Sequence, residues 1–429
     1  MRRADNGALV LVIQIQIIIF SFFMEIVSRN IVTILSWTAF TLISALYVAF
    51  HNSIVYNKYF VIYVLLLYCI FALTLTKVQY ITSIIYSFTV FNVIIVTLFF
   101  WFTVFAAGFS ILTFFRYILN YATIVSILTV VECFLKRNII FGLWSRADSS
   151  NYKQSGKAQY VPYGSFGNHI VLSIYLILII ILSTYIIRYY KYYVITLLFA
   201  SLGVLMSGVR TAYLAVAILF LYFVLRSILM ATVGKRSITT LVFSLILLIG
   251  VFMLFKYGKS VSFVELINQR IEALTGRESA SGRHRFEAIR IVFGLYAEAS
   301  PLVWFWGSGS GTIAAMMRTQ QIAHGEMSGF YVIDNQWMES LYDGGLFLIL
   351  PLVVIFCKAI APSLDVSKTS KDGYSVYLSF AFITYLIFMF SFETFTWVSS
   401  ASIFGLLLAL MPYSGQTLIA EREQLGRVV

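Results

Sequence analysis

Long runs of apolar residues, separated by short polar stretches, make up most of this sequence. A helix needs about 20 apolar residues to cross the hydrocarbon core of a membrane. Stretches of about that length lie near residues 8–28, 31–50, 58–76, 80–104, 112–135, 168–187, 191–207, 211–230, 237–256, 341–361, 374–393 and 397–413. The pattern therefore predicts an all-α, polytopic membrane protein with about 12 transmembrane helices.

Polar sequence is concentrated in two long segments, residues 136–167 and residues 257–340. The second is too long to be a simple connector between helices. Within it, apolar residues recur at helical spacing from Phe286 to Tyr296, which predicts an amphipathic helix. Neither a repeat of fixed period nor an inverted symmetry is evident. Residues 1–429 are therefore expected to form a single transmembrane domain, with one large, partly helical loop inserted between the ninth and tenth helices.

Basic residues in the short connections predict which side of the membrane each loop faces, because cytoplasmic loops are enriched in lysine and arginine. With the N-terminus inside, the short outer loops carry only Arg29, Lys77 and Arg210. The inner loops then hold Lys58, Arg116, Arg188, Lys191, Arg226, Lys235, Arg236, Lys358, Lys368 and Lys371. Both termini are therefore predicted to be cytoplasmic, and the large loop is predicted to lie outside.

Composition agrees with a membrane location, since 60% of the residues are hydrophobic and only 11% are charged. The mean hydropathy of +0.90 excludes an ordinary soluble globular protein. The net charge of +12 places an excess of basic residues in loops, and residues 136–167 hold five basic residues against one acidic residue. This segment predicts an anionic partner. No cluster of cysteine, histidine or paired carboxylates predicts a metal or cofactor site, and a nucleic-acid partner is not expected.

Arginines outside the predicted helices are the first candidates for chemistry. Arg210 lies in the motif SGVRT, residues 207–211, on a turn so short that two helices hold it near the membrane surface. Its guanidinium group suits bidentate binding of phosphate oxygens. Arg283, Arg285 and Arg290 open the amphipathic stretch, and two such arginine sites could hold one pyrophosphate. For Arg210, the alternative is a side chain that extends to the membrane interface without binding a ligand. For the second cluster, the alternative is a solvated, charged helix face.

Alternating glycines occur in residues 307–311, GSGSG, with Gly309 in the middle. Glycine permits positive φ angles and close approach of a ligand to the backbone. The segment is not a nucleotide-binding loop, because no Walker lysine follows and the GxGxxG pattern is absent. A flexible turn flanked by aromatic residues is the alternative interpretation.

Asp334 and Asn335 stand just before the tenth predicted helix. A carboxylate in this place could act as a general base, and His324 is a second candidate for that role. Asp334 could equally form a structural ion pair with one of the arginines.

These motifs, in this order, resemble those of the O-antigen polymerase and O-antigen ligase superfamily, which are bacterial membrane glycosyltransferases. The resemblance rests on the layout of helices, SGVRT, Gly282-Arg283, the glycine run ending at Gly311, and Asp334-Asn335. The motif YGSFGN, which ends at Asn168, is similar to an earlier glycine-asparagine motif of the family. Ligases of the superfamily typically have a histidine where this chain has Asp334, and that departure favours a polymerase.

The resemblance implies a location in the bacterial inner membrane and a transfer that needs neither metal nor cofactor. An undecaprenyl-pyrophosphate-linked oligosaccharide would pass its glycan to a hydroxyl group of an acceptor sugar. Arg210 and Arg283 would stabilise the departing pyrophosphate, and Asp334 or His324 would orient or deprotonate the acceptor hydroxyl. Further substrate contacts are expected from Arg285, Arg290, Asn335, Gly309 and Asn168. Membrane lipid is an expected partner, and a chain-length regulator protein is a candidate partner.

Two alternatives stay open at this point. An O-antigen ligase would transfer the glycan to lipid A core or another acceptor. A lipid-linked oligosaccharide flippase would also be a basic protein with about a dozen helices, but transporters commonly show repeated halves and charges along a central pathway. Here one outer loop dominates and the charges gather outside the helices.

Overall fold

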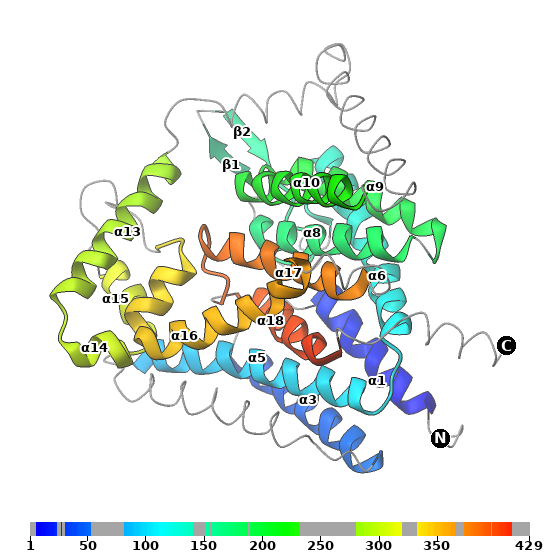
Figure 1. The fold of residues 1–429 in the computed structure, drawn as a ribbon, viewed down its shortest axis with the longest axis horizontal. Coiled ribbons are helices and arrows are strands. Elements are labelled where there is room, and N and C mark those ends of the chain that lie inside the picture. Colours follow the sequence, from blue (N-terminus) through cyan, green and yellow to red (C-terminus); the bar gives the residue numbers. More distant parts are fainter. Residues whose placement is uncertain are drawn as a thin grey trace.

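The computed structural model describes residues 6–23, 27, 31–52, 81–139, 151–154, 157–187, 189–231, 280–319, 333–364, 373–395 and 397–413. Helices make up nearly all of these residues (Figure 1). They are α1 (Asn6–Ile18) with the π-helical turn η1 (Ile19–Phe23), α3 (Ile31–His51), α5 (Ile81–Ala106), α6 (Ile111–Leu135), α8 (His169–Ile186), the 3-10 turn η2 (Lys191–Tyr193), α9 (Val194–Ser207), α10 (Arg210–Ala231), α13 (Ala280–Glu298), α14 (Pro301–Trp306), α15 (Thr312–Arg318), α16 (Gln336–Leu364), α17 (Gly373–Met389), α18 (Val398–Leu410) and the 3-10 turn η5 (Met411–Tyr413).

The predicted transmembrane helices coincide with observed helices wherever the structure describes them. Predicted helices 58–76 and 237–256 lie outside the described residues. Within the described residues, the helices that are long and apolar enough to cross a membrane are Val32–His51, Ile111–Leu135, His169–Ile186 and Gln336–Pro362. Several shorter apolar helices accompany them. By helix composition, the chain is a multi-pass membrane protein.

One element departs from the all-helical prediction. Strands β1 (Asn151–Gln154) and β2 (Lys157–Tyr160) pair antiparallel, with Asn151 opposite Tyr160 and Gln154 opposite Lys157. They belong to the polar segment before α8, where no apolar periodicity signals a strand. Two four-residue strands in a polar segment leave little trace in the hydrophobic pattern.

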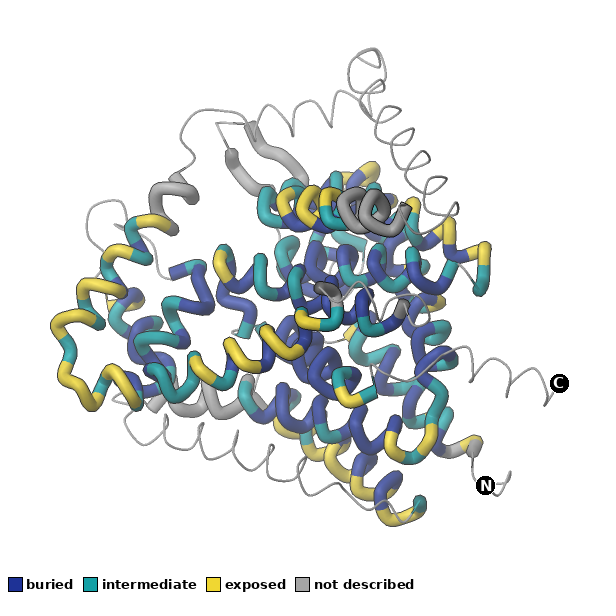
Figure 2. Tube along the Cα trace, viewed as in Figure 1, coloured by how far each residue is buried: buried dark blue, intermediate teal, exposed yellow. Residues whose placement is uncertain are grey.

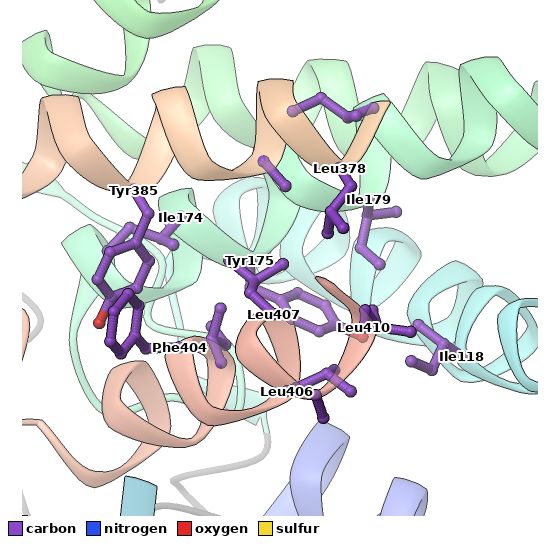
Figure 3. Close-up of a cluster of buried hydrophobic side chains, with 14 of the residues drawn as sticks. Ile118, Ile174, Tyr175, Ile179, Leu378, Tyr385, Phe404, Leu406, Leu407 and Leu410 are labelled. Atoms are coloured by element: carbon purple, nitrogen blue, oxygen red, sulfur yellow. The ribbon is translucent and has the colours of Figure 1, made fainter. Parts of the chain in front are cut away.

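The core of the bundle is rich in aromatic side chains. Tyr385 of α17 stacks on Phe404 of α18 with ring centroids 5.1 Å apart, and Tyr175 of α8 lies close by (Figure 3). An apolar cavity of about 90 Å³ lies between α6, α8, α17 and α18, and it is lined by apolar and tyrosine side chains. Exposed positions lie mostly on the outer helices, including α3, α10, α13 and α14 (Figure 2). None of the predicted site residues lines the cavity.

The predicted amphipathic helix is confirmed as α13. Its buried residues Ala288 and Val292 pack with Ile313 and Met317 of α15 and with Ile333. Phe286, which the sequence placed on the apolar stripe, is 78% exposed. Helices α13, α14 and α15 together form a lobe beside the first turns of α16, at one end of the bundle (Figure 1).

Candidate functional site

Arg210 is the first residue of α10, directly after the tight turn that ends α9. Gly208 ends α9 with φ 70°, a left-handed conformation that glycine adopts at no steric cost. Ser207 Oγ donates to the carbonyl of Val204 (2.7 Å) and accepts the N–H of Val209 (3.3 Å), which closes the turn. The half-buried Arg210 is thereby held at the end of two packed helices, as the motif predicted.

The segment between α17 and α18, residues 390–397, reaches this turn. Thr211 Oγ1, one residue after Arg210, donates to Ser391 Oγ over 2.7 Å. The sequence predicted a helix through residue 393, but α17 ends at Met389. The apolar run FMFSF, residues 388–392, gives no sign of this early end in the sequence. The helix ends where the segment begins its contacts with other elements, rather than where its composition changes.

Asp334 and Asn335 form the start of α16. Asn335 is fully buried, and its Oδ1 accepts the N–H of Met338 (3.1 Å), so that its side chain caps the helix. Asp334 has φ 53°, a left-handed conformation in which aspartate and asparagine are several-fold enriched among non-glycine residues. The N–H of Ile333, just before it, donates to Glu393 Oε1 over 3.1 Å.

Three carboxylates gather behind Asp334. Glu339 and Asp343 lie one turn apart on α16, and Glu393 lies in the segment after α17. Burial raises the pKa of Glu393 well above its usual 4.5, and repulsion from Glu339 and from Asp334 adds to the rise. The guanidinium of Arg318, at the end of α15, attracts both Glu393 and Glu339. The start of α16 is therefore rich in carboxyl groups, and the guanidinium of Arg318 lies near them.

The glycine run serves packing in this structure. Asp343 accepts the N–H of Gly311 (2.5 Å) and that of Ile313 (3.0 Å), which attaches the start of α15 to α16. The N–H of Gly309 donates to the carbonyl of Asp343 (3.0 Å). A Cβ on Gly307 would lie 2.1 Å from that same carbonyl oxygen. The backbone of the run is thus engaged by α16, and the glycines are required because the two segments touch.

Gly345 offers a direct test of this packing. It interrupts α16 with φ 63° and ψ −165°, so that the helix has two parts, and a Cβ here would lie 2.5 Å from the nitrogen of Gly307. We expect Gly345→Ala to lower the free energy of unfolding by roughly 1–3 kcal/mol. The matched control is Gly294→Ala on α13, where nothing lies within 4 Å. In detergent, the control should unfold at the same temperature as the unaltered protein or higher, and equal melting of the two variants would contradict the packing role.

The remaining predicted site residues have different surroundings. Asn168 caps α8, since its Oδ1 accepts the N–H of Ile170 over 2.7 Å. Arg290 lies 2.8 Å from Glu287 in an ion pair whose arginine side chain is 80% exposed. Arg283 and Arg285 lie in the first turns of α13, but their side chains are outside the described part of the structure. His324 falls in residues 320–332, which also lie outside it. The convergence of Arg283 on Arg210 stays a prediction.

Sequence reasoning missed two buried carboxylates. Glu393 is one, and Glu132 near the end of α6 is the other. Glu132 accepts the backbone N–H groups of Tyr163 (3.0 Å) and Gly164 (3.1 Å), and thereby fixes the YGSFGN segment in front of α8. Both residues stand at the end of a long apolar run, where an ionisable residue is costly and marks a candidate functional position. That signal was present in the sequence.

The comparison with known families covers this region of the chain. Residues 195–353 match the family model described as O-antigen ligase, Wzy_C. This part of the chain is an O-antigen ligase family domain. It runs from α9 to the middle of α16 and includes Arg210, the α13–α15 lobe and Asp334. The resemblance inferred from the motifs is thereby confirmed. Wzy_C proteins are membrane ligases and polymerases of the glycosyltransferase type, in polysaccharide and lipopolysaccharide biosynthesis. No curated protein matches the sequence.

Proposed function

We propose that this Wzy_C protein is a polymerase that joins undecaprenyl-pyrophosphate-linked oligosaccharide units on the periplasmic face of the bacterial inner membrane. One observation supports the proposal above the others. Arg210 and Asp334 are 124 residues apart in sequence, yet their segments are connected through the same short stretch, residues 391–395. A cation suited to pyrophosphate and a carboxylate suited to a hydroxyl group are therefore carried by neighbouring segments.

In the proposed reaction, the pyrophosphate of the donor binds at the start of α10. The guanidinium of Arg210 and the partial positive charge of the helix N-terminus both favour an anion there. Arg283 is the proposed second cation. As the bond between the anomeric carbon and the pyrophosphate breaks, the electron pair leaves with the pyrophosphate, where the arginines stabilise the added charge.

Asp334 is the proposed acceptor of the proton from the attacking hydroxyl group. The new bond forms between that oxygen and the anomeric carbon, while the proton moves to the carboxylate. A carboxylate within 2.6–3.2 Å of the hydroxyl oxygen meets the geometric requirement. His324 remains the alternative base.

The proposed orientation follows from the charge of the loops, which puts both termini in the cytoplasm and the α13–α15 lobe outside. Apolar side chains on the outer faces of the helices, such as Val32 (66% exposed) and Phe50 (81% exposed), would contact membrane lipid. A chain-length regulator is a proposed partner of the outer face.

Purified protein in lipid vesicles, supplied only with lipid-linked repeat units, tests the proposal. A polymerase should convert them into a ladder of longer lipid-linked chains, because each chain serves as donor and each unit as acceptor. A product that forms only after lipid A core is added would identify a ligase and reject the polymerase. Movement of intact units across the bilayer, with no new glycosidic bond, would identify a flippase.

A further inference from the structure

Residues 391–395, which we call the strap, lie between α17 and α18 and touch both halves of the proposed site. We propose that the strap sets the separation between Arg210 and Asp334, and that Glu393 is its central positioning residue. The inference rests on the proposed function, since it assigns to the strap the task of holding the proposed pyrophosphate site and the proposed base at a fixed distance.

Three hydrogen bonds at alternate residues carry the inference. Ser391 accepts from Thr211, beside Arg210 (2.7 Å). Glu393 accepts from the N–H of Ile333, beside Asp334 (3.1 Å). The N–H of Phe395 donates to Gln336 Oε1, in the first turn of α16 (2.7 Å). The strap is built of turns and bends, in which the N–H of Thr394 donates to the carbonyl of Phe392 (3.0 Å). In this conformation it makes one contact to α10 and two to the segment that begins α16.

The strap is itself held firmly. Phe392 is buried and stacks on Trp397 with ring centroids 6.0 Å apart. Thr394 is fully buried. The ring of Phe395 lies 5.0 Å from that of Phe404, in the aromatic core of α18. Because these side chains anchor the strap to the bundle, its three polar contacts can fix the positions of α10 and α16 relative to one another.

Glu393 is the least replaceable of the three contacts. Its side chain is 6% exposed, and the group that it binds is the backbone of the residue before Asp334. Loss of the acceptor would leave a buried N–H without its partner, next to a residue already in a left-handed conformation. We therefore expect Asp334 to shift when Glu393 is shortened. A misplacement of about 1 Å can reduce a rate by about 10²-fold.

The test compares Glu393→Ala with Glu393→Gln in the chain-extension assay. Alanine removes the acceptor, and we expect kcat to fall by roughly ten- to a hundredfold, with KM for the lipid-linked unit within about twofold. Glutamine keeps an acceptor oxygen at the same distance and should retain most of the rate. Thr211→Val should also lower kcat, and its effect should not add to that of Glu393→Ala, because both variants release the same strap. The matched control is Glu298→Ala, an exposed carboxylate at the end of α13.

Stability against pH supplies a readout apart from activity. Glu393 faces Asp334, Glu339, Asp343 and Arg318. Because its pKa is raised in the folded state, its contribution to stability is full below about pH 4.5 and is lost as pH rises through the raised pKa. In detergent, the melting temperature should therefore fall more between acid and alkaline pH for the unaltered protein than for Glu393→Gln. Parallel pH profiles would contradict the burial of this carboxylate beside its neighbours.

The outcomes separate the two proposals. If Glu393→Ala extends chains as fast as the Glu298→Ala control, the positioning role of the strap is contradicted, while the proposed polymerase activity is unaffected. An equal loss of rate in Glu393→Ala and Glu393→Gln would also contradict the proposal, because glutamine keeps the hydrogen-bond acceptor. Absence of any ladder from the unaltered protein would instead reject the polymerase.

Discussion

Replacing Arg210 with alanine is expected to lower chain extension by roughly 10²–10³-fold, the usual cost of removing one group that stabilises charge in a transition state. Arg210 is held at the end of two packed helices by a turn that Ser207 closes and by the bond from Thr211 to Ser391. The proposed leaving group gains its negative charge as the glycosidic bond breaks. A guanidinium fixed in this place would stabilise that charge more in the transition state than in the bound donor.

Arg210→Lys separates charge from geometry. Lysine keeps the positive charge but lacks the planar fork that binds two phosphate oxygens at once. We expect a rate between those of the alanine variant and the unaltered protein. The measurement is the initial rate of ladder formation in vesicles at saturating lipid-linked unit, because a loss in kcat distinguishes charge stabilisation from weaker binding of the donor.

The control for these variants is Lys191→Ala, in η2 at the far end of α8. This cation is exposed and precedes α9, whereas Arg210 follows the opposite end of that helix. Its removal should leave the rate within about twofold of the unaltered protein, as is usual for exposed charges away from a site. If Arg210→Ala also extends chains at half the normal rate or more, the pyrophosphate does not bind at the start of α10.

The fold was largely predictable because a membrane imposes one strong rule. A run of about 20 apolar residues has few alternatives to a helix in hydrocarbon, since every backbone polar group must be satisfied within the segment. That rule located α3, α6 and α8 to within a few residues. It could not locate the break at Gly345, because the backbone contact that demands the break comes from Phe305 and Gly307 in another element.

The site was predictable only where local sequence determines it. The turn before Arg210 is specified by its own serine and glycine, and the cap of α16 is specified by Asn335. The strap has no such motif, because Glu393 acts on Ile333, a residue 60 positions earlier in the chain. An apolar window that ends in a carboxylate was nevertheless visible at residues 390–393 and at residues 130–132. In a membrane protein, a carboxylate at such a position is costly and is expected to have a partner from another segment.

Asp334→Asn is expected to lower the kcat of chain extension by roughly 10²–10⁴-fold, because it removes the proposed general base. Asparagine matches the size of aspartate and also tolerates a left-handed backbone, so the φ of 53° at this position can persist. The variant then removes the proton acceptor with little disturbance of α16. Alanine would be a poorer choice, because strain at this φ would confuse the loss of a base with a displaced helix.

Asp334→His gives the result its chemical meaning. Ligases that the motifs of this chain resemble typically carry histidine here, and an imidazole has an ordinary pKa of about 6.5. We expect the histidine variant to recover part of the rate and to need a higher pH for it, since the ring accepts a proton only when neutral. The measurement is the pH dependence of kcat for the aspartate and histidine forms. Full activity of Asp334→Asn, together with inactive His324→Gln, would transfer the role of base to His324. Partial recovery by histidine with an unchanged pH profile would mean that residue 334 binds the acceptor sugar rather than its proton.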